Sequence, residues 1–159
     1  MNIQSAQTNM PIDIRLALDE DVAAVTDCVC QAFMRYILRI GKQPGPMLDD
    51  YQTLVRQGAV YVAAQEGVVL GVLVLVVTQE GFCIETIAVH PNSQGLGIGS
   101  KLLFYAETQA RQSGYTSIYL STHKLMHESQ SVYAHLGYVE FDRRIVHGYD
   151  RIFVRKQLQ

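Results

Sequence analysis

ETIAVHPNSQGLGIGSKLLFYAETQARQSG, residues 85–114, decides the fold of this chain. A short strand rich in apolar side chains is predicted up to Val89, and the proline, asparagine and serine that follow predict the turn that ends it. Beyond Ile98 the apolar residues recur at helical spacing, and Gly114 is the residue type that most often stops a helix. The stretch therefore predicts a strand, a glycine-rich turn and an amphipathic helix.

The glycine-rich turn brings Gly95, Gly97 and Gly99 to the start of that helix. A helix start carries unpaired N–H groups and about half a positive charge, and glycines leave a ligand free access to both. The pattern predicts a backbone cradle for a phosphate-bearing ligand. A P-loop would need Gly-Lys-Ser/Thr where Gly99-Ser100-Lys101 stands, and a dinucleotide fingerprint would need a third glycine at Ser100. A glycine-rich turn without a ligand is the remaining alternative.

Composition indicates an ordinary globular protein. The chain has 159 residues, 48% of them hydrophobic and 18% charged, which predicts one domain over residues 1–159. A net charge of −2 argues against nucleic acid or an anionic membrane as a partner. The three cysteines lack Cys-x-x-Cys spacing, which favours reduced thiols over disulfides or a zinc ribbon. The longest apolar run is too short to span a bilayer and the first ten residues lack a secretory pattern, so we expect a cytoplasmic protein.

Hydrophobic periodicity predicts an alternation of strands and helices along the rest of the chain. Asp19 is the expected cap of the first helix, and Gly58 is expected to end the second. The fold class is therefore α+β, a three-layer α/β/α sandwich around a mixed, mostly antiparallel sheet. The predicted strands are residues 12–16, 60–64, 68–77, 82–89, 117–120, 138–141 and 152–154, and the predicted helices are residues 19–36, 46–56, 98–113 and 128–136.

Two motifs resemble the GCN5-related N-acetyltransferase (GNAT) superfamily. One is Gln94-x-x-Gly-x-Gly99 after a strand that ends Ala-Val-His-Pro, and the other is SVYAHLGY at residues 131–138, which is similar to the family's short helix with its Tyr-x-x-x-Gly-aromatic ending. The resemblance covers roughly residues 12–158. It implies a sheet with a V-shaped splay between two parallel strands, residues 87–89 and 117–120 here, and acetyl-CoA as co-substrate.

The resemblance also implies which residues bind acetyl-CoA. The pantetheine arm would complete the missing backbone pairing in the splay, a backbone N–H near Ile87 or Val89 would bond the thioester oxygen, and the cradle would hold the pyrophosphate. Plain core packing is the alternative interpretation of the strand residues. The implied coenzyme-binding residues are Ile87, Ala88, Val89, Gln94, Gly95, Leu96, Gly97, Ile98, Gly99 and Ser100.

Tyr133 and Glu85 are the candidate catalytic residues. Tyr133 closes the family's short helix, and a phenol of pKa about 10 can protonate or hydrogen-bond a leaving thiolate of pKa about 8.5. Acetyl transfer also needs a neutral amine, and Glu85 is the candidate base because strand alternation would place it on the same face as Ile87. A tyrosine that anchors its helix and a solvated carboxylate are the respective alternatives. Met126 replaces an asparagine that is common in relatives, so that coenzyme contact is not expected.

No metal is expected, because His123 and His127 flank a loop and have no third ligand in sight. Residues 36–50 lie where the family has its acceptor-binding loop. The sequence thus predicts an acetyl-CoA-dependent N-acetyltransferase that acts on a primary amine of a small molecule or peptide by direct attack in a ternary complex. A non-catalytic acyl-CoA-binding module and a different acyl donor are the alternatives. A homodimer is a possible assembly of the chain.

Overall fold

The computed structural model describes residues 10–159, in which seven strands form one mixed sheet of order β1-β2-β3-β4-β5-β7-β6. Neighbouring strands are antiparallel except β4 and β5, which are parallel. The polar residues 1–9, on which the expectation of no secretory signal rests, lie outside the described part. The strands are β1 Asp13–Leu16, β2 Val60–Gln65, β3 Val68–Thr78, β4 Gly81–Val89, β5 Ser117–His123, β6 Val139–Val146 and β7 Tyr149–Gln157.

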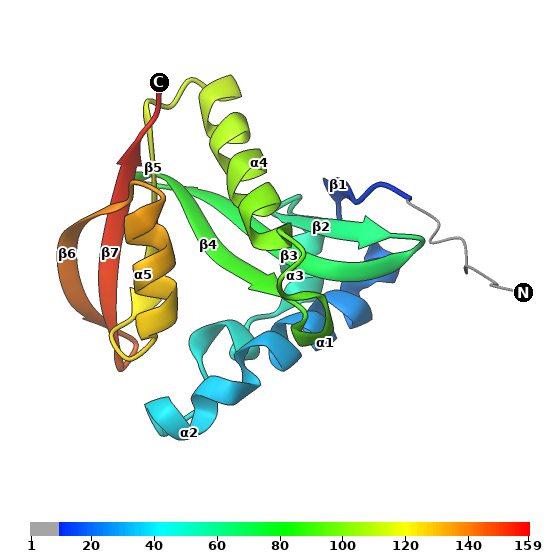
Figure 1. The fold of residues 1–159 in the computed structure, drawn as a ribbon, viewed down its shortest axis with the longest axis horizontal. Coiled ribbons are helices and arrows are strands. Elements are labelled where there is room, and N and C mark those ends of the chain that lie inside the picture. Colours follow the sequence, from blue (N-terminus) through cyan, green and yellow to red (C-terminus); the bar gives the residue numbers. More distant parts are fainter. Residues whose placement is uncertain (1–9) are drawn as a thin grey trace, which may run out of the picture.

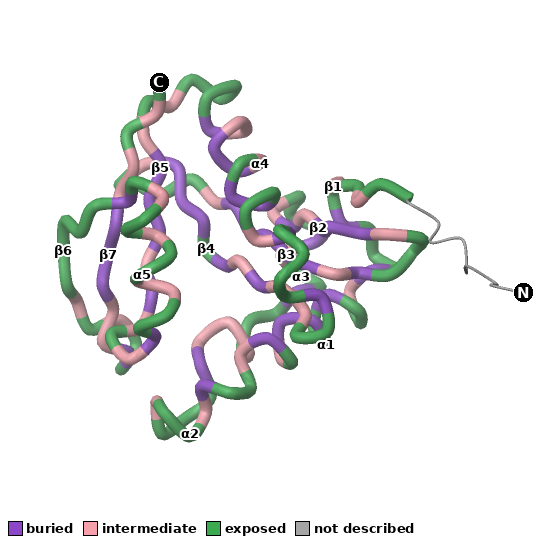
Figure 2. Tube along the Cα trace, viewed as in Figure 1, coloured by how far each residue is buried: buried purple, intermediate pink, exposed green. Residues whose placement is uncertain are grey.

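Helices cover both faces of the sheet, which confirms the predicted α+β sandwich (Figure 1). Two cores result because side chains of the central strands alternate between the faces. In β3, Leu73 packs beneath α4 while Val72 packs against α1, and Figure 2 shows the buried middle of the sheet between the two helical layers. The helices are α1 Val22–Phe33, α2 Ile37–Ile40, α3 Tyr51–Arg56, α4 Ile98–Gln112 and α5 His127–His135, with 3-10 turns η1 Asp19–Asp21, η2 Met34–Tyr36, η3 Gly45–Leu48 and η4 Pro91–Ser93.

The parallel strands β4 and β5 diverge after a short paired stretch. Their register pairs Phe82 with Ile118, then runs to Ile84 with Leu120, where pairing between the two strands stops in the described chain. Beyond that point β4 continues along β3, and β5 continues along β7 (Figure 1). A β-bulge lies at the same place, because Ile84 and Thr86 pair with consecutive residues of β3. The predicted V-shaped splay is therefore present.

Two predictions about helix starts are wrong. The carboxylate that organises the first helical segment belongs to Asp21 and not Asp19: it accepts the Leu18 N–H at 2.7 Å and pairs with Arg15 at 2.7 Å. The predicted helix over residues 46–56 is two pieces, η3 and α3. Asp49 between them has an extended backbone, and the Asp50 side chain accepts the Thr53 N–H at 3.2 Å, which starts α3 afresh.

The last two strands are longer than predicted. The sequence pattern predicts pairing over residues 138–141 and 152–154, whereas β6 and β7 form a hairpin through the His147-Gly148 turn. Both turn residues have positive φ, 50° and 82°, and this geometry matches the twist of the flanking strands. Charged side chains dominate the outer half of this hairpin, which hides its strand pattern in the sequence. None of the helices between residues 10 and 159 has the length and apolar character needed to cross a membrane.

Candidate active site

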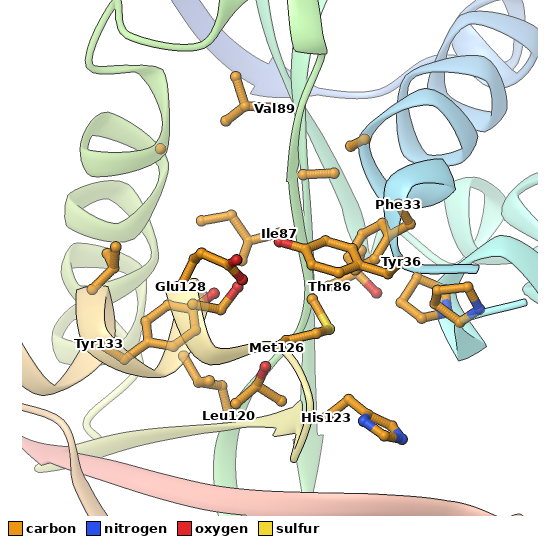
Figure 3. Close-up of a pocket in the computed structure, with 18 of the residues that line it drawn as sticks. Phe33, Tyr36, Thr86, Ile87, Val89, Leu120, His123, Met126, Glu128 and Tyr133 are labelled. Carbon is orange, nitrogen blue, oxygen red and sulfur yellow. The ribbon is translucent and has the colours of Figure 1, made fainter. Parts of the chain in front are cut away.

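A cavity of about 500 Å³ occupies the space where β4 and β5 diverge. Its walls come from β4, from β5, from the start of α4, from α5 and from the segment between α1 and η3. Figure 3 shows Tyr133 on one wall and Phe33 and Tyr36 on the opposite wall, with Ile87 and Thr86 of β4 between them. Residues far apart in the sequence therefore share one hollow.

The edge of β4 that borders this cavity carries free backbone groups. The His90 N–H donates to the Leu70 carbonyl at 2.8 Å, so His90 turns its backbone groups toward β3. Backbone direction alternates along a strand, and Ile87 and Val89 consequently turn theirs toward β5, which has already diverged. These N–H and C=O groups face the cavity as an open strand edge, which an extended ligand could extend.

The predicted cradle lies at one end of the same cavity. Among the described residues, the backbone N–H groups at positions 95–100 have no backbone acceptor, whereas those of Gln94 and Lys101 do. Gly95 and Gly97 have φ of 83° and 77°, a conformation that favours glycine. A Cβ at either position would meet no described atom within 4 Å, which leaves the space before the helix start open. The cradle is thus a run of donors beside α4, whose N-terminus favours an anion.

One member of the cradle differs from the others. Leu96 is 61% exposed and does not line the cavity among the described residues. Its side chain therefore points away from the ligand space, and its backbone N–H is its possible contribution. No lysine or arginine from residues 93–100 lines this end of the cavity, so its positive character comes from backbone dipoles.

Tyr133 points into the cavity from α5 (Figure 3). Its ring packs edge-on against Tyr138 with centroids 5.8 Å apart, which fixes its direction. Within residues 10–159 its hydroxyl has no hydrogen-bond partner. Burial raises the pKa of Tyr133 above its usual range, and the nearby Tyr36 phenol adds to the effect. The phenol is therefore protonated at neutral pH and free to donate to a ligand.

Glu85 lines the cavity from β4, at the bulge. Alternation from Ile87, the sequence argument for its position, does not hold there, because the bulge inserts a residue between Ile84 and Thr86. Burial raises the pKa of Glu85, the charge of Asp49 raises it further, and Arg151 opposes both. A carboxylate whose pKa is raised is a stronger base than an ordinary glutamate.

The sequence profile of the acetyltransferase (GNAT) family matches residues 29–138. The chain belongs to the GNAT family. It is 30% identical over 141 residues to the uncharacterized N-acetyltransferase YjgM of Escherichia coli K12, a match that covers 83% of this chain and 84% of that protein.

Solved GNAT structures share the fold. PaiA N-acetyltransferase from Thermoplasma acidophilum, in complex with coenzyme A, superposes with a TM-score of 0.76 at 16% identity and covers 93% of this chain and 99% of its own. YncA, a putative acetyltransferase from Salmonella typhimurium with acetyl-CoA, superposes with a TM-score of 0.69 at 21% identity and covers 94% and 95%. The seven-stranded sheet and its splay are therefore those of a GNAT fold.

Arg151 and Thr122 of this cavity are absent from the sequence predictions, and Tyr36 is present only as the first residue of the segment 36–50. Tyr36, 3% exposed, has its hydroxyl in the cavity wall, where it accepts a hydrogen bond from Arg35 at 2.6 Å. Arg151 reaches the cavity from β7. Thr122 lines it from β5 with a buried hydroxyl that has no partner in the described chain. No motif marks these side chains, because the fold alone brings their strands and helices to the splay.

The histidines and cysteines have structural surroundings. The His90 Nδ1 accepts the Asn92 N–H at 3.2 Å, and the His123 Nδ1 accepts the Leu125 N–H at 3.0 Å. Burial lowers the pKa of His123. The described residues contain no group of three His, Cys, Asp or Glu side chains placed to hold a metal ion. Burial raises the pKa of the Cys28 and Cys83 thiols to about 12, which makes both unreactive.

The segment predicted to bind the acceptor is tied down across the splay. Arg39 of α2 pairs with Glu128 of α5 at 2.7 Å. Lys42 donates to the Gly148 carbonyl at 2.9 Å, and the Tyr149 hydroxyl donates to the Gln43 carbonyl at 2.5 Å. These contacts join the two halves of the GNAT fold beside the cavity.

Proposed function

We propose that this protein transfers the acetyl group of acetyl-CoA to a primary amine of a small molecule, by direct attack in a ternary complex. One observation carries the proposal: an open strand edge, an anion cradle, a protonated phenol and a carboxylate of raised pKa all face one cavity. Membership of the GNAT family supports the same chemistry.

The chain's own groups fit the coenzyme. The N–H groups at positions 95–100 would hold the pyrophosphate, and the free groups of Ile87 and Val89 would pair with the amides of the pantetheine arm. The unpartnered Thr122 hydroxyl offers a further hydrogen bond in the cavity wall. When bound, acetyl-CoA supplies the activated acyl group, and an N–H of Ile87 or Val89 would stabilise the negative charge that grows on its carbonyl oxygen.

Glu85 would prepare the acceptor. An amine of pKa about 10.4 is neutral in about one molecule in a thousand at neutral pH, a handicap of about 4 kcal/mol. The Glu85 carboxylate would take the ammonium proton directly or through a water, and its raised pKa suits that task. The neutral amine then attacks the thioester from the Glu85 side of the cavity.

Tyr133 would stabilise the thiolate that leaves. Its raised pKa keeps the phenol protonated, and a transfer of that proton to a thiolate of pKa about 8.5 is uphill. We therefore assign Tyr133 the role of hydrogen-bond donor to the departing sulfur. This role needs a hydroxyl that points into the cavity, and Figure 3 shows the Tyr133 side chain among the residues that line it.

A small-molecule acceptor fits better than a peptide. A peptide would extend out of the site, whereas the bridges from Arg39, Lys42 and Gln43 tie residues 37–46 across the splay beside the acceptor end of the cavity. These ties hold the segment across the splay, which favours a compact acceptor over an extended chain.

The test is an amine screen that follows thiol release from acetyl-CoA, with products checked by mass spectrometry. Amine-dependent thiol release with one acetyl group added per turnover is the expected result. Tight acetyl-CoA binding without transfer to any of a broad panel of amino acids, polyamines, aminoglycosides and aryl amines would instead favour a non-catalytic acyl-CoA-binding module.

A further inference from the structure

Arg151 brings a guanidinium to the acceptor side of the cavity without a carboxylate partner. It lies on β7 opposite His123 of β5, and its Nη1 donates to the Ser121 Oγ at 3.1 Å. Its Nε is buried and has no hydrogen-bond partner among the described residues. No described carboxylate oxygen approaches the guanidinium within ion-pair distance. Buried donors are nearly always satisfied in proteins, so this one points to a missing acceptor.

The guanidinium is held in place before any ligand arrives. A Cβ on Gly45 would lie 2.8 Å from the Arg151 Nη2, so the backbone of η3 sits directly against the charged group. The same segment is tied to β7 by the hydrogen bond from the Tyr149 hydroxyl to the Gln43 carbonyl. A fixed, planar guanidinium can bind a carboxylate through two parallel hydrogen bonds at little entropic cost.

The other cavity arginine, Arg35, has no buried donor without a partner in the described chain. Arg35 donates to the Tyr36 hydroxyl at 2.6 Å and lies over the Tyr36 ring. Arg39, which does not line the described cavity, forms a two-pronged pair with Glu128. Arg151 is thus the cavity arginine with a buried donor that has no partner in the described chain.

Opposite charge lies near by. The charge of Arg151 acts on both Glu85 and Asp49, yet neither carboxylate is within 4.0 Å of it in the described chain. The acceptor end therefore holds a fixed cation, Arg151, and a separate carboxylate, Glu85, at which the amine would lie. A ligand with a positive and a negative group matches this arrangement, whereas a polyamine would place a second cation against Arg151.

We propose that the acceptor is an amino acid, whose carboxylate binds the Arg151 guanidinium while its amine lies at Glu85. This assignment rests on the proposed acetyl transfer and names its substrate class. Phe33, Tyr36 and Ile40 line the same cavity, so we expect the amino acid to carry an apolar side chain.

Matched acceptors test the proposal without altering the protein. The best amino acid of a screen is compared with its carboxamide and with its decarboxylated amine at saturating acetyl-CoA. Because a bidentate, charge-assisted contact is lost, we expect kcat/KM to fall by about 30-fold or more for both analogues. Equal rates for the decarboxylated amine, or for peptides through their N-termini, would overturn the amino acid assignment and leave acetyl transfer intact.

An Arg151→Gln variant tests the residue itself. It should lower kcat/KM for the amino acid by a similar factor and bring the amino acid and its carboxamide to within about threefold of each other. Loss of Arg151 also raises the pKa of Glu85, so both proteins are compared at a pH above the acid limb. The acetyl-CoA Kd and the melting temperature control for folding. Discrimination that survives in a folded variant refutes the role of Arg151.

Binding separates this proposal from the proposed function. Calorimetric titration of the coenzyme A complex with the amino acid and with its carboxamide needs no turnover. Binding of the amino acid that requires Arg151, in a protein that transfers no acetyl group, would keep the carboxylate site and reject the acetyltransferase activity. If neither binding nor transfer occurs with any amino acid, the carboxylate site is refuted as well.

Discussion

The two ends of the cavity are built in different ways. The coenzyme end comes mainly from one continuous stretch, from the end of β4 through the start of α4, and it presents backbone N–H and C=O groups, with the Thr122 hydroxyl of β5 as a further donor. The acceptor end comes from separate elements and presents side chains: Glu85 on β4, Ser121 on β5, Arg151 on β7 and Tyr36 before α2.

This difference explains why substitutions can alter the ligand of the acceptor end more easily than that of the coenzyme end. A backbone donor does not depend on side-chain identity, provided that glycines leave it accessible, as Gly95 and Gly97 do. A charged side chain such as Arg151 specifies its ligand by its own chemistry, and one substitution alters the choice. The fold can therefore retain its coenzyme while the acceptor end diverges.

The largest effect is expected where the two ends meet, at Tyr133. Tyr133→Phe removes only the hydroxyl, so kcat should fall by about 100-fold while the acetyl-CoA Kd changes less than about twofold. Steady-state kinetics and calorimetry measure the two quantities. Tyr115→Phe, outside the described cavity lining, is the matched control and should keep full activity. A Tyr133→Phe protein with normal kcat would return this tyrosine to a packing role.

At the acceptor end, Glu85→Gln should lower kcat/KM by about 30-fold near neutral pH. The loss should shrink as pH rises toward the amine pKa, because solution then supplies the neutral amine that the carboxylate supplied before. A pH profile of both proteins measures this convergence, with Glu66→Gln in the β2–β3 turn as control. A loss that stays constant with pH would mean that Glu85 orients the acceptor and takes no proton.

At the coenzyme end, Gly99→Glu should raise the acetyl-CoA Kd by about tenfold or more, because a carboxylate would face the pyrophosphate. The site can hold a side chain, since a Cβ at position 99 lies 3.7 Å from the Val89 Cγ2, whereas Gly97 has a φ that would strain any replacement. Leu96→Glu adds the same charge on a side chain that points away. For that control we expect the acetyl-CoA Kd to change by less than about threefold. Equal losses of affinity in both variants would mean that added negative charge weakens binding in general and not through the cradle.

The smallest expected effect concerns Asp49. Its charge raises the pKa of Glu85, so Asp49→Asn should lower that pKa and move the acid limb of kcat/KM to lower pH. Activity near neutral pH should change by less than about threefold, because Asp49 is only one of the influences on the Glu85 pKa, beside burial and the opposing charge of Arg151. An acid limb that does not move would show that another group titrates in the reaction.

Local patterns predicted most elements, and they were wrong where tertiary contacts outweigh them. Asp19 and Asp21 are equally good cap residues by type, but the Asp21 carboxylate, from the third position of η1, is the one that accepts the Leu18 N–H and pairs with Arg15 of β1. Alternation along β4 was a sound argument for Glu85, but a bulge breaks it at the point where β4 and β5 diverge. A bulge of this kind leaves no residue pattern in a single strand.

The sequence by itself determined the strand, the glycine turn and the helix of residues 85–114, and with them the open cradle. Each of these features depends on neighbours in the chain: apolar spacing, glycine at positive φ, and the unpaired N–H groups of any helix start. Only the tertiary structure decided that Arg151, 66 positions after Glu85 in the numbering, faces the same cavity. The strand order β4-β5-β7 brings Arg151 to this cavity, because β7 pairs with β5, the strand that diverges from β4. Such long-range pairing cannot be derived from local residue preferences.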